Sequence, residues 1–178
     1  EYVDDAIVLD KEPNGDMDIR VSLFTKRFGK MVAKAKSGRK ITSKLSGHLE
    51  PGFRIQARLV EKNGLQIVDA LKISGADRPP ADFFRLNLLL ADREPDTALW
   101  NALAAPKWRW EGVLRLLGWD PREAACEECG KENPDFFNIR RQTFFCRACG
   151  ERYSSAKMPG NSREQRELSI EITSSAAS

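Results

Sequence analysis

DIRVSLFTKRFGKMVAKAK, residues 18–36, alternates apolar and polar side chains along two predicted β-strands that Phe28-Gly29 separates. Every second residue is apolar from Ile19 to Leu23, and again from Met31 to Ala35. A period of two is the pattern of a strand with one buried face. The stretch therefore predicts two neighbouring strands of a sheet, and it places Lys34 and Lys36 side by side on the polar face.

Further strands are predicted on both sides of this stretch. AIVLDKE (residues 6–12) is followed by the turn sequence PNGD, in which Gly15 can take a positive φ. FRIQARLVE (53–61) and LQIVDALKI (65–73) flank Asn63-Gly64, a signal for a type I′ hairpin turn. Five short strands with one long loop between the third and the fourth predict a closed barrel, either an OB-fold or an SH3-like barrel.

Three short helices are predicted after the strands. GADRPPAD (75–82) ends the strand region, and apolar helical segments follow at residues 82–91, 94–104 and 107–118, the last closed by Gly118. Tryptophan at helical spacing is more often core than a base-stacking platform. We therefore expect these tryptophans to join the helices to the barrel or to the cysteine-bearing segment: Trp100, Trp108, Trp110 and Trp119.

The four cysteines form two C-x2-C pairs separated by sixteen residues, a spacing typical of a four-thiolate zinc site. Such a site has no open position for substrate, so the pattern predicts one structural Zn²⁺. Two disulfides or a pair of redox motifs are the alternatives. The predicted ligands are Cys126, Cys129, Cys146 and Cys149, with a glycine for a tight turn after the second cysteine of each pair and four phenylalanines as a small core.

Basic residues concentrate between residues 26 and 44, where eight cations occur without an acid. Like charges at this density repel one another unless an anion lies across them, and a phosphate backbone is a common partner. A solvated surface is the alternative. The predicted nucleic-acid-binding residues are Lys26, Arg27, Lys30, Lys34, Lys36, Arg39, Lys40 and Lys44.

The charge distribution is uneven although the net charge is only +3. Seven acids and one lysine lie in residues 1–18, whereas residues 19–62 hold twelve cations and two acids, which favours a single basic face. No apolar run approaches the roughly 18 residues of a membrane span, and the acidic start is unlike a targeting peptide, so we expect a cytoplasmic protein. The single histidine, His48, is expected on the surface, and neither a phosphate loop nor a nucleophile elbow is present, which argues against an enzyme.

Three passages together resemble the bacterial recombination mediator family RecO: AIVLDKEPNGDMDIRVSLFTKRFGKMVAKAKSG, GRKITSKLSGHLEPG, and LRLLGWDPREAACEECG with FFCRACG. The resemblance covers residues 2–75 and about 108–150. It implies an OB-fold that binds single- and double-stranded DNA at the nucleoid, anneals strands and helps to load recombinase. It also implies a RecR-like partner and single-stranded DNA-binding protein as a second partner. Because little helical sequence follows Cys149, the chain is expected to be a short member.

The sequence therefore predicts an α+β protein in which a five-stranded OB-fold barrel precedes a small helical segment bearing a four-cysteine zinc module. The expected parts are the barrel at residues 1–77, the helical segment at 78–122, the zinc module at 123–153 and a mostly flexible tail at 154–178, in which LSIEIT could form a short strand. The predicted function is DNA binding in recombinational repair. A zinc-bearing protein-interaction adaptor and an RNA-binding protein of the ribosome or transcription machinery are the alternatives.

Overall fold

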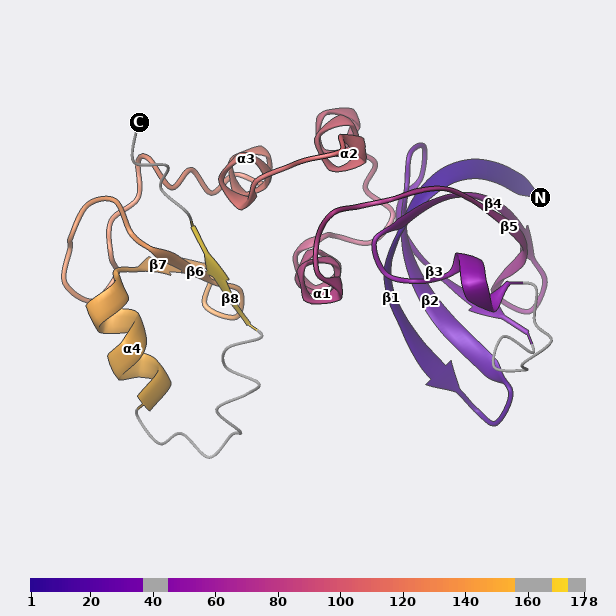
Figure 1. The fold of residues 1–178 in the computed structure, drawn as a ribbon, viewed down its shortest axis with the longest axis horizontal. Helices are drawn as coiled ribbons and strands as arrows, with labels where there is room; N and C mark the ends of the chain where they lie inside the picture. The colour runs from indigo at the N-terminus through magenta and orange to yellow at the C-terminus, as the bar shows by residue number, and fades with distance from the viewer. Residues whose placement is uncertain (37–44, 156–167, 173–178) are drawn as a thin grey trace. The chain divides into compact units, whose positions relative to one another are not determined.

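The computed structural model describes residues 1–36, 45–155 and 168–172 of the chain (Figure 1). Two compact units are present, Glu1–Lys107 and Trp108–Ser178, so the predicted helical segment 78–122 is divided between them. Within the described residues, no helix is long and apolar enough to cross a membrane.

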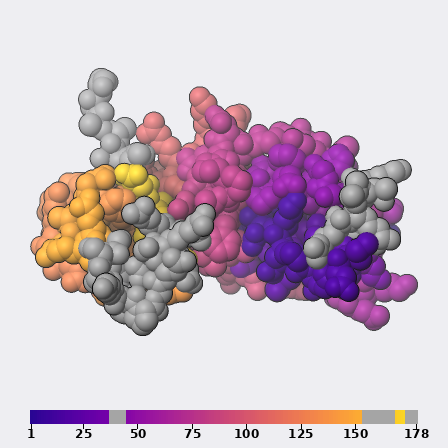
Figure 2. Space-filling model, turned by 60° about the horizontal axis from the view of Figure 1, so that its bottom comes forward, coloured from indigo at the N-terminus to yellow at the C-terminus, as the bar shows by residue number. Residues whose placement is uncertain are grey.

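A closed five-stranded barrel forms the first unit, as predicted, with the strand order β1-β2-β3-β5-β4. Antiparallel pairing of β1 with β4 closes the barrel, and β3 pairs with β5 in parallel. Figure 2 shows the N-terminal strands, in indigo, lying against the later strands, in purple, within one body. The strands are β1 (Tyr2–Asn14), β2 (Asp18–Thr25), β3 (Gly29–Ala35), β4 (Phe53–Glu61) and β5 (Leu65–Gly75), and a short 3-10 helix, η1 (Ser46–His48), precedes β4.

The apolar and polar alternation of these strands separates the barrel interior from its outer surface. Val21, Leu23 and Ala33 are buried in the barrel core, in agreement with the predicted period of two. At the hairpin between β4 and β5, both Asn63 and Gly64 have positive φ, as the predicted type I′ turn requires. The predicted OB-like barrel is therefore confirmed.

Two helices, α1 (Pro80–Leu89) and α2 (Thr97–Ala104), belong to the same unit as the barrel. Helix α1 contacts β1, which is why this strand is apolar on its outer side as well as its inner side. Ile7 of β1 pairs with Phe24 of β2, and both side chains are buried although they do not belong to the barrel core cluster. The Phe24 ring lies 6.1 Å from the Trp100 ring of α2. Asp96 begins α2 by accepting a hydrogen bond of 2.9 Å from the Leu99 amide.

The second unit contains helix α3 (Trp110–Leu116), a three-stranded sheet in the order β7-β6-β8, and helix α4 (Arg147–Ser155). The strands are β6 (Phe136–Asn138), β7 (Thr143–Phe145) and β8 (Ser169–Glu171). The short strand expected within LSIEIT is present as β8, where Ile170 is buried. Gly118 follows α3 with a φ of +94°, as expected of the glycine that closes this helix. Most of the predicted flexible tail lies outside the described residues.

The tryptophans pack as expected of core residues. Trp100 lies against the barrel residue Phe24, whereas Trp119 lies 5.1 Å from Phe137 beneath the cysteine-bearing module. Trp108 and Trp110 meet edge to face at 5.2 Å. Each of these ring contacts lies within one unit.

Candidate nucleic-acid interface and metal centre

The eight predicted DNA-binding cations fall into three groups in the structure. Lys26 and Lys36 are exposed, at the turn between β2 and β3 and directly after β3. Arg27, Lys30 and Lys34 are held in intramolecular contacts. The other three lie outside the described residues: Arg39, Lys40 and Lys44.

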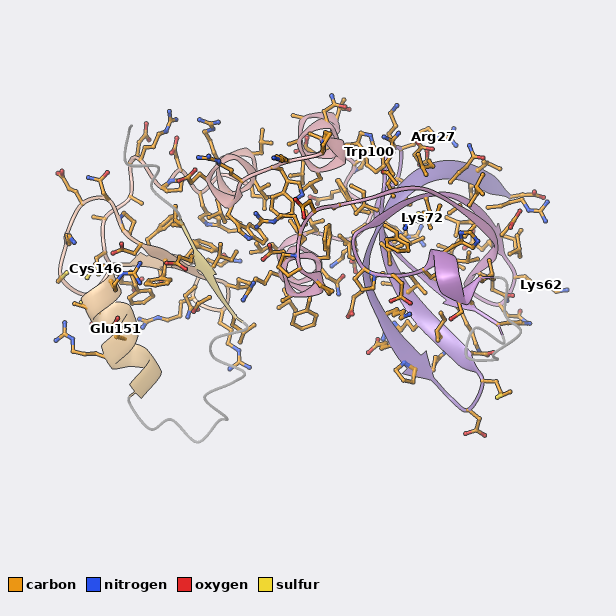
Figure 3. The ribbon with its side chains drawn as sticks, viewed as in Figure 1. Arg27, Lys62, Lys72, Trp100, Cys146 and Glu151 are labelled. Atoms are coloured by element: carbon orange, nitrogen blue, oxygen red, sulfur yellow. The ribbon has the colours of Figure 1, made fainter. Side chains whose placement is uncertain are left out.

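Arg27 and Lys30 are both tied to neighbouring parts of the first unit. Arg27 bonds the buried carboxylate of Asp4 twice, through its backbone amide at 2.9 Å and through Nε at 3.2 Å, and Figure 3 shows it on the barrel. The Nζ of Lys30 lies 3.0 Å from the Asn87 carbonyl and 3.0 Å from an Asp92 carboxylate oxygen. With its side chain only 14% exposed, Lys30 anchors the end of α1 to the barrel.

Strands β2 and β3 place a further cation beside the predicted set. Arg20 lies directly opposite Lys34 in the antiparallel register and on the same outer face. The alternation of apolar and polar residues along β2 already places Arg20 on the polar side of the strand. The sequence therefore indicated this cation, although Arg20 precedes the dense basic stretch. Lys34 contacts Asp18 at 2.9 Å, and Arg20 contacts Glu12 at 3.3 Å.

A second group of cations lies on the later strands of the barrel. Lys62 projects from the tip of the β4–β5 hairpin, and Lys72 lies with its Nζ 3.4 Å from the centre of the Phe53 ring (Figure 3). The amide of Lys72 donates to Nδ1 of His48 at 3.2 Å, so His48 joins η1 to β5. This histidine has a structural contact that its position in the sequence did not indicate.

The four cysteines meet in the second unit, with all four sulfur atoms within 4.8 Å of one another. The Sγ atoms of Cys129 and Cys146 are 3.7 Å apart. Zn–S bonds of about 2.3 Å in a tetrahedron require sulfurs about 3.8 Å apart, so the donor set and its spacing fit a tetrahedral metal site. None of the four cysteines forms a disulfide, which contradicts the disulfide alternative.

Backbone hydrogen bonds hold the first knuckle in place. The Cys126 amide donates to the Lys131 carbonyl at 2.8 Å, and the Gly130 amide donates to the Cys126 carbonyl at 2.8 Å. Gly130 has a φ of +71°, as predicted for a tight turn. The same prediction for Gly150 is wrong: this residue lies inside α4, and a Cβ there would approach the Phe136 ring to 3.4 Å.

The thiols differ in their ease of ionisation. Burial opposes ionisation of Cys126, but hydrogen bonds from the backbone amides of Cys146, Cys129 and Glu128 outweigh it and lower the pKa of the thiol to about 6. Burial raises the pKa of Cys149 to about 12, although Arg152 donates to its Sγ at 3.0 Å. A divalent cation would supply the positive charge that several adjoining thiolates need.

The predicted phenylalanine core is present beneath the cysteines. Phe137, Phe144 and Phe145 are buried, and the rings of Phe137 and Phe144 are 5.0 Å apart. Phe136 is only half-buried, and the guanidinium of Arg147 lies 5.2 Å from the centre of its ring. The four cysteines and their core thus come from β6, β7 and α4 together with the first knuckle.

Comparison with known proteins relates the chain to a single family. Residues 1–76 match the family model "Recombination protein O N terminal". The DNA repair protein RecO of Thermodesulfovibrio yellowstonii is 26% identical over 186 residues, covering 89% of this chain and 74% of that protein. That of Bifidobacterium longum (strain DJO10A) is 26% identical over 175 residues, covering 83% and 73%, and that of Bifidobacterium adolescentis is 30% identical over 158 residues, covering 73% and 64%.

These alignments extend well past the barrel and take in most of the chain. The barrel order and the positions of its basic strands agree with the resemblance drawn from the sequence. The chain therefore belongs to the RecO family, and residues 1–76 form its N-terminal domain.

Proposed function

We propose that this protein is a DNA-binding mediator of recombinational repair that anneals complementary strands and helps to load recombinase. One observation carries the proposal: residues 1–76 match the N-terminal domain of a family whose members are named DNA repair proteins, and they fold into a barrel of the OB type. The cations on β2, β3 and the adjoining turn supply the chemistry for phosphate contacts. Such work takes place in the cytoplasm, at the nucleoid.

The barrel grips phosphates and reads few bases. Lys26 and Lys36 are exposed point charges, and strands β2 and β3 themselves offer no exposed aromatic side chain, since their single aromatic residue, Phe24, is buried. Contacts of this kind position a nucleic acid without selecting its sequence. Binding is therefore expected to tolerate any sequence and to depend strongly on salt.

Fluorescence anisotropy of a labelled single strand and of its duplex, at several salt concentrations, tests this proposal. If about five phosphates are neutralised, log K falls with log salt at a slope of about −4.5 on duplex and about −3.5 on single strands. Lys26→Glu with Lys36→Glu should weaken binding at least tenfold. The control is Lys107→Glu with Lys131→Glu, which makes the same change in net charge away from the barrel strands. A flat salt response, or equal effects of both pairs, would refute the phosphate grip.

The intramolecular contacts of Arg27, Lys30 and Lys34 favour a second candidate, a protein-interaction adaptor. In that case the remaining lysines serve solubility, and the metal-bearing unit recruits partners. By resemblance these would be a RecR-like protein and single-stranded DNA-binding protein. An adaptor would keep its partner after Lys26 and Lys36 are reversed in charge. Competition among single-stranded DNA, duplex DNA and structured RNA of equal length tests the RNA-binding alternative.

The cysteine cluster is proposed to hold one structural Zn²⁺. Cys126, Cys129, Cys146 and Cys149 would be its four ligands, which leaves no site for a substrate. The ion neutralises the thiolates and joins the two knuckles. Metal analysis of the purified protein should find one zinc per chain.

A further inference from the structure

Four charged side chains form a cluster on the outer face of β1, β2 and β3. Glu12 of β1 contacts Arg20 of β2 at 3.3 Å, and Asp18, the first residue of β2, contacts Lys34 of β3 at 2.9 Å. The strand register sets this cluster, because Glu12 lies opposite Arg20 and Arg20 lies opposite Lys34. Asp18 precedes Arg20 by two residues on β2 and therefore lies on the same face. We call these four residues the hairpin quartet.

The two cations of the hairpin quartet are a like-charge pair. Residues directly opposite on antiparallel strands have Cβ atoms about 5 Å apart, so Arg20 and Lys34 repel each other. Each cation is compensated by a carboxylate from the β1–β2 hairpin. The arrangement therefore concentrates positive charge on the β2–β3 face and, at the same time, covers it with negative charge.

Both cations remain accessible to a ligand from solvent. The side chain of Arg20 is 56% exposed and that of Lys34 is 42% exposed. Exposed ion pairs are weak, and a phosphate makes the same kind of charge-assisted hydrogen bond as a carboxylate. An incoming phosphate can therefore replace Glu12 or Asp18 without disturbing the strands.

We propose that Glu12 and Asp18 act as built-in competitors that set the affinity and the salt dependence of DNA binding. The inference rests on the proposed function, since it concerns the same face of the barrel. In the free protein the carboxylates occupy Arg20 and Lys34. When DNA binds, phosphates take over both cations, and the freed carboxylates recruit cations from solution.

This exchange has a consequence for counterions. A cation that binds a phosphate directly releases a counterion from the DNA, which contributes about −0.9 to the salt slope on duplex. When the cation first leaves a carboxylate, the uncovered negative charge attracts cations from solution, which partly offsets this release. Removing the carboxylate should therefore tighten binding and also steepen its salt dependence.

Asp18→Asn is the direct test, because it keeps the shape of the side chain and removes its charge. We expect duplex binding at low salt to be about two- to fivefold tighter and the salt slope to steepen by as much as about 0.9. Asp16→Asn is the matched control. Asp16 lies exposed in the turn directly before β2 and makes no ion pair among the described residues, and its substitution changes the net charge equally.

A double mutant shows whether the effect of Asp18→Asn on DNA binding depends on the ion pair between Asp18 and Lys34. In a Lys34→Gln background, Asp18→Asn should change DNA affinity no more than Asp16→Asn does, because the cation for which Asp18 competes with phosphate is absent. Glu12→Gln, with Arg20→Gln as its background, repeats the test on the other pair. Thermal melting confirms that each variant is folded.

The outcomes separate the inference from the proposed function. Equal effects of Asp18→Asn and Asp16→Asn on affinity and slope would overturn the inference and leave the DNA-binding function standing. Binding by Asp18→Asn but not by the unaltered protein would support the inference in its strongest form. If neither binds DNA at low salt, both proposals are refuted.

Discussion

Gly29 lies where the chain after α1 passes close to the barrel. Its φ is +69°, and a Cβ at this position would lie 2.4 Å from the backbone carbon and oxygen of Glu94. The Arg93 amide donates to the Lys30 carbonyl at 2.8 Å, so the approach is held by a hydrogen bond. Only glycine satisfies both the backbone conformation and the contact.

Gly29→Ala should therefore lower the free energy of unfolding of the barrel by about 2–4 kcal/mol. Gly15→Ala is the matched control, because Gly15 has a φ of +73° but no heavy atom within 4 Å of the added Cβ. It should cost only about 1 kcal/mol, the strain of the left-handed conformation. Urea denaturation followed by far-UV circular dichroism measures both, and equal losses would contradict the close-packing argument.

Asp10 is a residue whose charge works against folding. Burial raises its pKa above 3.8; the hydrogen bond from the Lys11 amide acts in the opposite direction, and the nearby charge of Glu12 raises the pKa further. A carboxyl with a raised pKa contributes most to stability below its unfolded pKa, and this contribution is lost as the pH rises through the folded pKa.

Asp10→Asn should accordingly stabilise the protein at pH 7 by a few tenths of a kcal/mol. The gain should shrink as the pH falls towards about 4, because the aspartic acid of the unaltered protein then becomes neutral as well. Paired urea denaturation curves at several pH values measure this. A gain independent of pH would show that burial of the charge is not its cause.

At the scale of a single element, β3 combines structural and exposed cations within a few residues. Lys30 is bonded to Asn87 and Asp92, whereas Lys36 is exposed directly after the strand. Position in the alternating pattern does not distinguish them, since both were predicted on the polar face. Only the packing of α1 beside the start of β3 sets them apart.

Lys30→Gln should lower the stability of the barrel by about 1–3 kcal/mol, because it removes a charge-assisted hydrogen bond and leaves a partner unsatisfied. Lys36→Gln should leave stability unchanged and reduce the salt slope of DNA binding by about one. The two variants have the same net charge and are compared by thermal melting and by anisotropy. If Lys36→Gln lowered stability and Lys30→Gln reduced the salt slope instead, the roles assigned to the two lysines would be reversed.

At the scale of the whole molecule, the two units are stabilised by different interactions. The first has a closed barrel with its own apolar core. The second has small strands of three residues each, and its buried cluster includes Cys126, Cys146 and Cys149. Because three of the four cysteines belong to this buried cluster, we expect the second unit to depend on the proposed metal, and structural zinc sites contribute of the order of 10 kcal/mol.

Removal of the metal should therefore unfold β6, β7 and α4 and leave the barrel folded. Hydrogen exchange in the presence of a chelator, or of a Cys126→Ser variant, should show loss of protection at Phe137 and Phe144 and retention at Val21 and Leu23. Excess Zn²⁺ should restore the chelated protein but not the variant. Retention of protection throughout the second unit would show that the module folds without metal.

The sequence by itself determined the parts that depend on local pattern. Period-two alternation predicted the barrel strands, Asn63-Gly64 predicted the hairpin turn, and the C-x2-C spacing predicted the cysteine cluster. The alternation and the turn signal lie within a few residues along the chain, and the two cysteine pairs are only sixteen residues apart. The resemblance to RecO rested on the same kind of signal, and the comparison of residues 1–76 confirms it.

Tertiary structure alone decided which cations remain available and which are paired. The partners of Arg27 and Lys30 come from β1 and from the chain around the end of α1, 23 and 57 residues away. Glu12 and Asp18 reach Arg20 and Lys34 only because three strands align in one register. Charge density is a property of sequence, but ion pairing depends on distances of about 3–4 Å between side chains, and only the packed barrel brings these groups that close.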